Sequence, residues 1–124
     1  MELKEYFAAV KGHGILSTAD SHGVVNSAVY ATPHFMDDGM IAFIMRERKS
    51  HHNVTENPSA CYLFIEKEKM GGKRLYLRRV REEMNTELLF SLRRYCPKDE
   101  TKSENLYLVF FRIEKVLPLI GYGS

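Results

Sequence analysis

The chain has 124 residues, of which 44% are hydrophobic and 27% charged, and its formal net charge at pH 7 is +2. A chain of this length can bury one hydrophobic core, so we expect a single domain over residues 1–124. So small a net charge gives no argument for nucleic acid as a partner, and we see no signal peptide and no apolar segment of membrane-spanning length. These features are typical of a soluble globular protein, and we expect a cytoplasmic one with no membrane partner.

The spacing of apolar residues predicts helices at three places in the chain. A first helix over residues 3–10 ends at Gly12-His13-Gly14, and a second, about two turns long, starts at Ser50 as its N-cap and stops before Pro58. A third is capped by Asn85, and its apolar face is formed by Leu88, Leu89, Leu92 and Tyr95. Apolar runs bounded by turn residues predict strands over residues 15–19, 24–32, 40–45, 60–65, 74–83, 106–113 and 117–120.

Together these elements predict a mainly β protein with a few helices. About six or seven antiparallel strands in so short a domain would leave exposed edges if the sheet stayed flat. A sheet that curls closed removes those edges, so we expect a small β-barrel.

The most informative segment is the basic loop between the third strand and the second helix. Arg46, Arg48 and Lys49 precede this helix, whose first backbone N–H groups have no partner within it. Free N–H groups reinforced by cations form a site for a dianionic phosphate. The alternative is that the three basic side chains only solvate a loop.

A second group of basic residues lies on one long predicted strand. Strand residues alternate between two faces, so Arg74 and Arg78 are expected on one face and Arg79 and Arg81 on the other. We interpret these charges as protection of an exposed strand edge. An alternative is a groove for an anionic substrate or for RNA, with Tyr76 and Tyr107 as stacking surfaces.

The order of several short motifs resembles the FMN-binding split-barrel family related to pyridoxamine 5'-phosphate oxidase. These motifs are the turn at residues 17–23, Val25-Asn26-Ser27-Ala28, Asp38-Gly39, Arg48-Lys49-Ser50, Asn53, Asn57-Pro58 and the glycine-flanked Tyr122 near the C-terminus. Each motif is weak alone, but their order along the chain is specific. The resemblance implies a split β-barrel of the FMN-binding type, with six or seven antiparallel strands.

The resemblance also implies a homodimer that holds FMN at the subunit interface. Arg48, Lys49 and Ser50 would bind the phosphate, and Asn53 would support the loop or reach the ribityl chain. Carried over by position, the implied cofactor-binding residues are Asn26, Ser27, Ala28, Val29, Tyr30, Phe43, Ile44, Arg46, Arg48, Lys49, Ser50, Asn53 and Tyr122. For Val29, Phe43 and Ile44 the alternative is core packing, because alternate residues of a barrel strand point inward.

Departures from the family's pattern limit the expected function. Pyridoxamine-phosphate oxidases carry arginine where this chain has Ala28 and lysine where it has Pro33, so pyridoxamine phosphate is not the expected substrate. The resemblance therefore implies an FMN-dependent oxidoreductase with a small-molecule redox substrate or electron donor. A non-catalytic FMN carrier and a nucleic-acid-binding barrel are the alternatives.

No catalytic residue can be named from the sequence, because flavin itself performs the electron transfer. His51 and His52 are the best candidates for a titrating group near the cofactor, although adjacent histidines on a surface helix often face water. The remaining histidines have no spacing that would gather a metal ion, so no metal site is expected.

Overall fold

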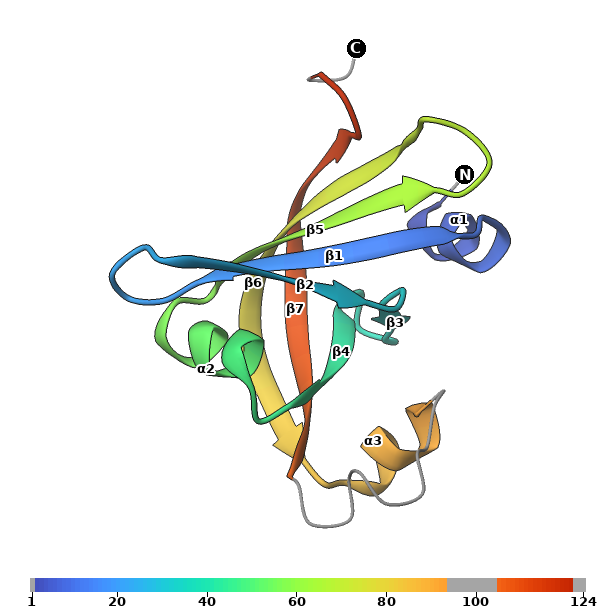
Figure 1. The fold of residues 1–124 in the computed structure, drawn as a ribbon. Helices are drawn as coiled ribbons and strands as arrows, with labels where there is room; N and C mark the ends of the chain where they lie inside the picture. The colour runs from blue at the N-terminus through green and yellow to red at the C-terminus, as the bar shows by residue number, and fades with distance from the viewer. Residues whose placement is uncertain (1, 94–104, 122–124) are drawn as a thin grey trace.

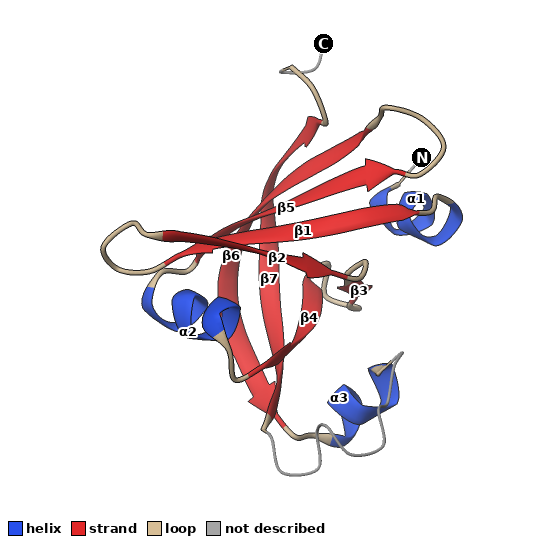
Figure 2. Cartoon of the chain, viewed as in Figure 1, coloured by secondary structure: helices blue, strands red, loops and turns tan. Residues whose placement is uncertain are grey.

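The computed structural model describes residues 2–93 and 105–121, which form one curled antiparallel sheet with helices around it (Figure 1). The strands are β1 (Gly12–Ala19), β2 (Val25–Tyr30), β3 (His34–Phe35), β4 (Ile41–Arg46), β5 (Ser59–Glu66), β6 (Gly72–Met84) and β7 (Leu106–Pro118). The helices described are α1 (Leu3–Ala9), α2 (Lys49–Glu56) and α3 (Glu87–Leu92), and none of them is long and apolar enough to cross a membrane. Figure 2 shows them at three separate places around the strands.

The two ends of the sheet are not joined to each other. The strand order is β2-β1-β5-β6-β7-β4-β3, so β2 lies at one end and the β4–β3 pair at the other. The sheet curls until these ends approach (Figure 1), and the rings of Tyr30 in β2 and Phe43 in β4 lie 5.7 Å apart between centroids. In the described residues no strand pairing bridges the ends, which leaves the barrel split along a seam. The predicted mainly β, antiparallel split barrel is confirmed.

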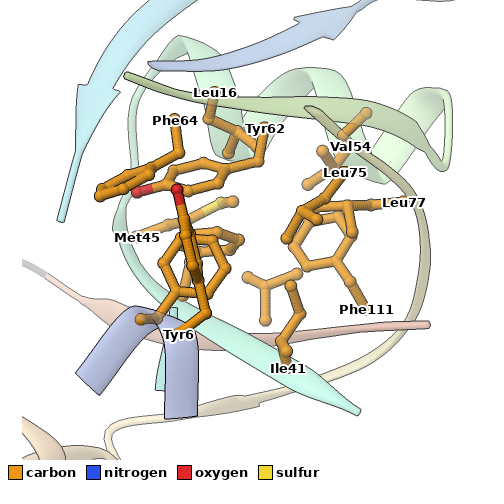
Figure 3. Packing of buried hydrophobic residues seen from close by; sticks show 14 residues of the cluster. Tyr6, Leu16, Ile41, Met45, Val54, Tyr62, Phe64, Leu75, Leu77 and Phe111 are labelled. Atoms are coloured by element: carbon orange, nitrogen blue, oxygen red, sulfur yellow. The ribbon is translucent and has the colours of Figure 1, made fainter. Parts of the chain in front are cut away.

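The main core fills the inside of the curled sheet (Figure 3). Alternation along β1 buries Leu16 and Thr18 and leaves the residues between them half-buried, as a strand with one covered face requires. The helix α1 covers one end with Phe7, whose ring meets that of Phe64 edge to face at 4.9 Å. The described α1 and β5 agree with the prediction to within a residue or two.

A second apolar cluster lies on the other face of β4 and β7, under α3. These two strands are therefore buried on both faces near their centre, which explains their continuous apolar runs. The predicted cap of α3 is wrong by one residue: Thr86 is the N-cap and accepts a hydrogen bond from the backbone N–H of Leu89. Asn85 has a φ of 52° and instead accepts from the backbone N–H of Leu106. Leu88, predicted on the apolar face, is exposed.

Strand boundaries differ from the prediction at three places. The two predicted C-terminal strands form one continuous strand, β7, and the short β3, which pairs only with β4, was not predicted. Gly12-His13-Gly14, where the first helix was predicted to end, lies inside β1, and α1 already ends at Ala9. Glycine is required at positions 12 and 14 because other atoms of the barrel approach the backbone closely there. A Cβ at Gly14 would collide with the hydroxyl of Tyr62, and a Cβ at Gly12 would collide with the carbonyl oxygen of Ile65.

The edge interpretation of the basic strand is wrong for the first half of β6, whereas residues 79–84 pair with β7 alone. Between residues 73 and 78, β6 pairs with β5 on one side and β7 on the other, so it is an interior strand. Arg74 there donates through Nε to the carbonyl oxygen of Pro118 at 2.9 Å and ties β6 to the end of β7. Its charge satisfies a backbone carbonyl rather than blunting an edge.

The predicted faces of Arg79 and Arg81 are also wrong. A register shift leaves Val80 without a partner in the ladder, so Arg79 pairs with Phe111 and Arg81 with Phe110. These two phenylalanines belong to the two different apolar clusters, on opposite faces of the sheet. Arg81 lies over the ring of Phe110 at 3.7 Å, whereas Arg79 turns toward α2.

We expect Gly14→Ala to destabilise the protein by about 1–3 kcal/mol, because the added methyl overpacks the contact with Tyr62. Chemical denaturation would measure the change. Gly71→Ala is the matched control, since a Cβ there meets nothing closer than 3.7 Å. Equal stability of the two variants would contradict the assigned role of Gly14.

Candidate functional site

A groove of about 410 Å³ runs along the seam between β2 and β4 and ends at the start of α2. Its lining residues are Asn26, Ala28, Val29, Tyr30, Ala31, Ile44, Arg46, Arg48, Lys49 and Ser50. Apart from Asn26 of β2 and Arg46 at the end of β4, the part of this wall that comes from the two strands is made of small or largely apolar side chains. The other part is the basic loop and first helical turn, so the groove has an apolar length and a cationic end.

The N-terminus of α2 forms the cationic end. Arg48 is the N-cap in extended conformation, no side chain caps the helix, and the first turn contains no acidic residue. The prediction that Ser50 is the N-cap is wrong, because the helix already begins at Lys49. Backbone N–H groups of the first turn, without a side-chain acceptor at the cap, are suited to an anion from outside the helix.

Ser50 is instead a contact between the helix and β2. It is 4% exposed and hydrogen-bonds the hydroxyl of Tyr30. Burial raises the pKa of Tyr30, and the hydrogen bond from Ser50 partly opposes that rise. Tyr30 therefore stays a neutral phenol, and the pair fixes the helix start against the strand that lines the groove.

The backbone at the end of β2 is held from inside the barrel. Tyr62 is fully buried, and its hydroxyl lies 3.2 Å from the carbonyl oxygen of Tyr30 and 3.1 Å from that of Ala31. Gly14 leaves the space that this hydroxyl occupies. Sequence reasoning missed both Ala31 as a lining residue and Tyr62 as its support, since neither position carries a local signal.

The structure brings most of the predicted cofactor-binding residues together in this groove. Ser27 lies on the outer face of β2, where its hydroxyl is 2.9 Å from that of Ser17, and Phe43 is buried in the main core beneath Tyr30. Asn53 is fully buried and donates through Nδ2 to Thr18 at 3.0 Å, so its contacts fit support of the helix rather than lining of the groove. Tyr122 lies outside the described residues.

No protein-family model matches the sequence, and no curated protein matches it. Several solved structures, in contrast, have a similar fold. An FMN-binding protein from Syntrophomonas wolfei subsp. wolfei is 21% identical with a TM-score of 0.72, over 93% of this chain and 82% of the other. A pyridoxamine 5'-phosphate oxidase-related, FMN-binding protein from Nostoc punctiforme is 12% identical with a TM-score of 0.63, over 86% and 72%. An F420 reductase is 15% identical with a TM-score of 0.56, over 94% and 97%.

At these identities the likeness shows a shared fold. The chain has the split-barrel architecture of FMN-binding proteins, as the sequence resemblance implied. Two of these neighbours are named as FMN-binding proteins and the third as an F420 reductase.

We expect Ser50→Ala to lower stability by about 1 kcal/mol, because the buried Tyr30 hydroxyl loses its partner. Ser27→Ala is the control, since its bond to Ser17 is exposed and its loss should stay within about 0.5 kcal/mol. Urea denaturation of both variants measures the difference. If both lost the same stability, the contact between α2 and β2 would not have the importance assigned to it.

Proposed function

We propose that the protein binds FMN in the seam groove, with the phosphate at the start of α2 and the ring system along β2 and β4. The observation that carries the proposal is the division of one groove into an apolar length and a cationic end. A flat aromatic ring with an anionic tail matches both parts. The donor set fits as well, because the first-turn backbone N–H groups, that of Ser50 included, and the loop cations are all hydrogen-bond donors.

The chain's residues would act by binding and orienting the cofactor. Ala28 and Ala31 line the groove with short methyl side chains, so a planar ring can lie close to the backbone of β2. Ile44 provides an apolar surface from β4, and Tyr30, held by Ser50, fixes the end of the strand. Bound flavin supplies one-electron or hydride transfer, which needs no acid, base or nucleophile from the protein.

We therefore assign the protein as a flavoprotein oxidoreductase that transfers electrons between small molecules. An FMN carrier without turnover is the second candidate, and it shares the same groove. A nucleic-acid-binding barrel is less well supported, because Tyr107, one of its two proposed stacking surfaces, already stacks on His51 at 3.8 Å. Reduction of the bound FMN by reduced nicotinamide under anaerobic conditions, faster than that of free FMN, separates the enzyme from the carrier.

We also propose that a second copy of the chain covers the groove. Ile15 on β1 pairs with Val29 on β2 and Leu63 on β5, and these three side chains form a row on the outer face of the sheet. Val29 is 80% exposed and also lines the groove. Because the apolar row continues into the groove wall, one partner could bury both. A homodimer with FMN at its interface follows.

The direct test of cofactor identity compares FMN with riboflavin. The phosphate is their only difference, so FMN should bind at least about tenfold more tightly if the cationic end holds it. Flavin fluorescence quenching on the apoprotein measures both affinities, and F420 can be added as a competitor. Equal affinities for FMN and riboflavin would contradict the phosphate site, and preferential binding of F420 would contradict FMN.

Lys49→Ala tests the location of the phosphate within the same assay. Removal of one charge-assisted contact should weaken FMN roughly tenfold and leave riboflavin almost unchanged. Lys67→Ala is the control, because Lys67 is exposed after β5 and does not line the groove.

The proposed dimer should form at micromolar concentration in sedimentation. A charge buried at the interface should dissociate it, so Ile15→Glu should give a monomer with weakened FMN binding. Val80→Glu, at an exposed position on β6, should leave the dimer intact. A wild-type monomer with stoichiometric FMN would refute the proposal.

A further inference from the structure

The first turn of α2 and the loop before it contact a polar cluster formed by Arg79 and Glu82 of β6 and Tyr107 of β7. The ring of His51 stacks on that of Tyr107, with centroids 3.8 Å apart and planes inclined by 14°. Nε2 of His51 lies 2.9 Å from Oε1 of Glu82, and the same oxygen is 3.0 Å from Nη2 of Arg79. His51 is 8% exposed, whereas the side chain of Glu82 is 24% exposed, so this contact is partly buried.

Tyr107 holds the loop on both sides of its phosphate-binding residues. The ring of Tyr107 packs against His51, the residue after Ser50. The hydroxyl of Tyr107 donates to Oε1 of Glu47, the residue before Arg48, at 3.1 Å. Tyr107 is itself fixed in the sheet, because β7 pairs with Met45 of β4 and Met84 of β6 at this position. One side chain of the sheet therefore contacts both ends of the segment that forms the cationic end of the groove.

The charges in this cluster favour a fixed geometry. Burial alone would raise the pKa of Glu82, but the bonds from Arg79 and His51 outweigh it and hold that pKa below its usual range. Glu82 is thus a carboxylate that can only accept, so Nε2 of His51 is the donor.

We propose that His51 and Tyr107 are positioning residues that preorganise the loop for phosphate and so set the preference for FMN over riboflavin. The inference rests on the proposed function, because it deepens the role of the same site. Neither residue lines the seam groove itself; both act through the backbone of the loop. A donor set held in place before binding loses less conformational entropy when the anion arrives.

The competing explanation is that the cluster only stabilises the fold. That role would reduce the folded fraction and so weaken FMN and riboflavin by the same factor. The ratio of the two affinities therefore separates the explanations, because only a positioning role changes it.

The test measures dissociation constants for FMN and riboflavin with three variants and one control. His51→Ala should lower FMN affinity by roughly tenfold, and Tyr107→Phe, which keeps the ring but loses the bond to Glu47, by about threefold, both with riboflavin almost unchanged. His51→Gln, which retains a donor toward Glu82, should recover part of the loss. It also keeps the proposal testable if His51→Ala does not fold.

His52→Ala is the matched control. This neighbouring histidine is 63% exposed in its side chain and pairs with Glu56 of its own helix, so the affinity ratio should stay at the wild-type value. A wild-type preference for FMN that survives in His51→Ala and Tyr107→Phe would overturn the inference alone. A wild-type ratio near one would overturn the proposed function and the inference with it.

Discussion

The seam between β2 and β4 is the constraint on which the site depends. In the described part of the chain the two ends of the sheet approach closely, yet they share no strand pairing. A strand edge without a partner leaves backbone N–H and C=O groups exposed, which a soluble protein must cover or use. Within the described residues Tyr30 and Phe43 make contact across the seam, and the groove lies along it beside Tyr30.

The helix α2 connects that seam to the rest of the barrel. It has 8 residues, too few for stability in isolation, so its position depends on tertiary contacts. Three of its side chains contact three different parts of the barrel. Ser50 hydrogen-bonds Tyr30 at the end of β2, Asn53 donates to Thr18 in the interior, and His51 contacts the cluster on β6 and β7. The helix start is therefore placed by strands from both halves of the chain.

Local patterns in the sequence were sufficient for the architecture. Apolar runs between turn residues predicted the main strands, and the basic loop before a short helix predicted the cationic end of the groove. Both signals arise from residues close together in sequence. The resemblance then supplied the residues of β2 and β4 that the structure places along one groove, Ile44 and Ala28 among them.

The features that the sequence did not predict depend on distant partners. Gly14 was predicted only as part of the segment that ends the first helix, because its need for space comes from Tyr62, in another strand. His51 and His52 are indistinguishable in sequence, but only His51 meets Tyr107 and Glu82. The faces of the basic strand were misassigned because alternation fails at the irregularity beside Val80, which no residue pattern announced.

A crystal structure of the protein grown with FMN would test the central claim most directly. We expect electron density for the ring system between β2 and β4 and for the phosphate within hydrogen-bond distance of Ser50 at the start of α2. FMN bound elsewhere on the barrel, or a phosphate directed away from α2, would contradict it.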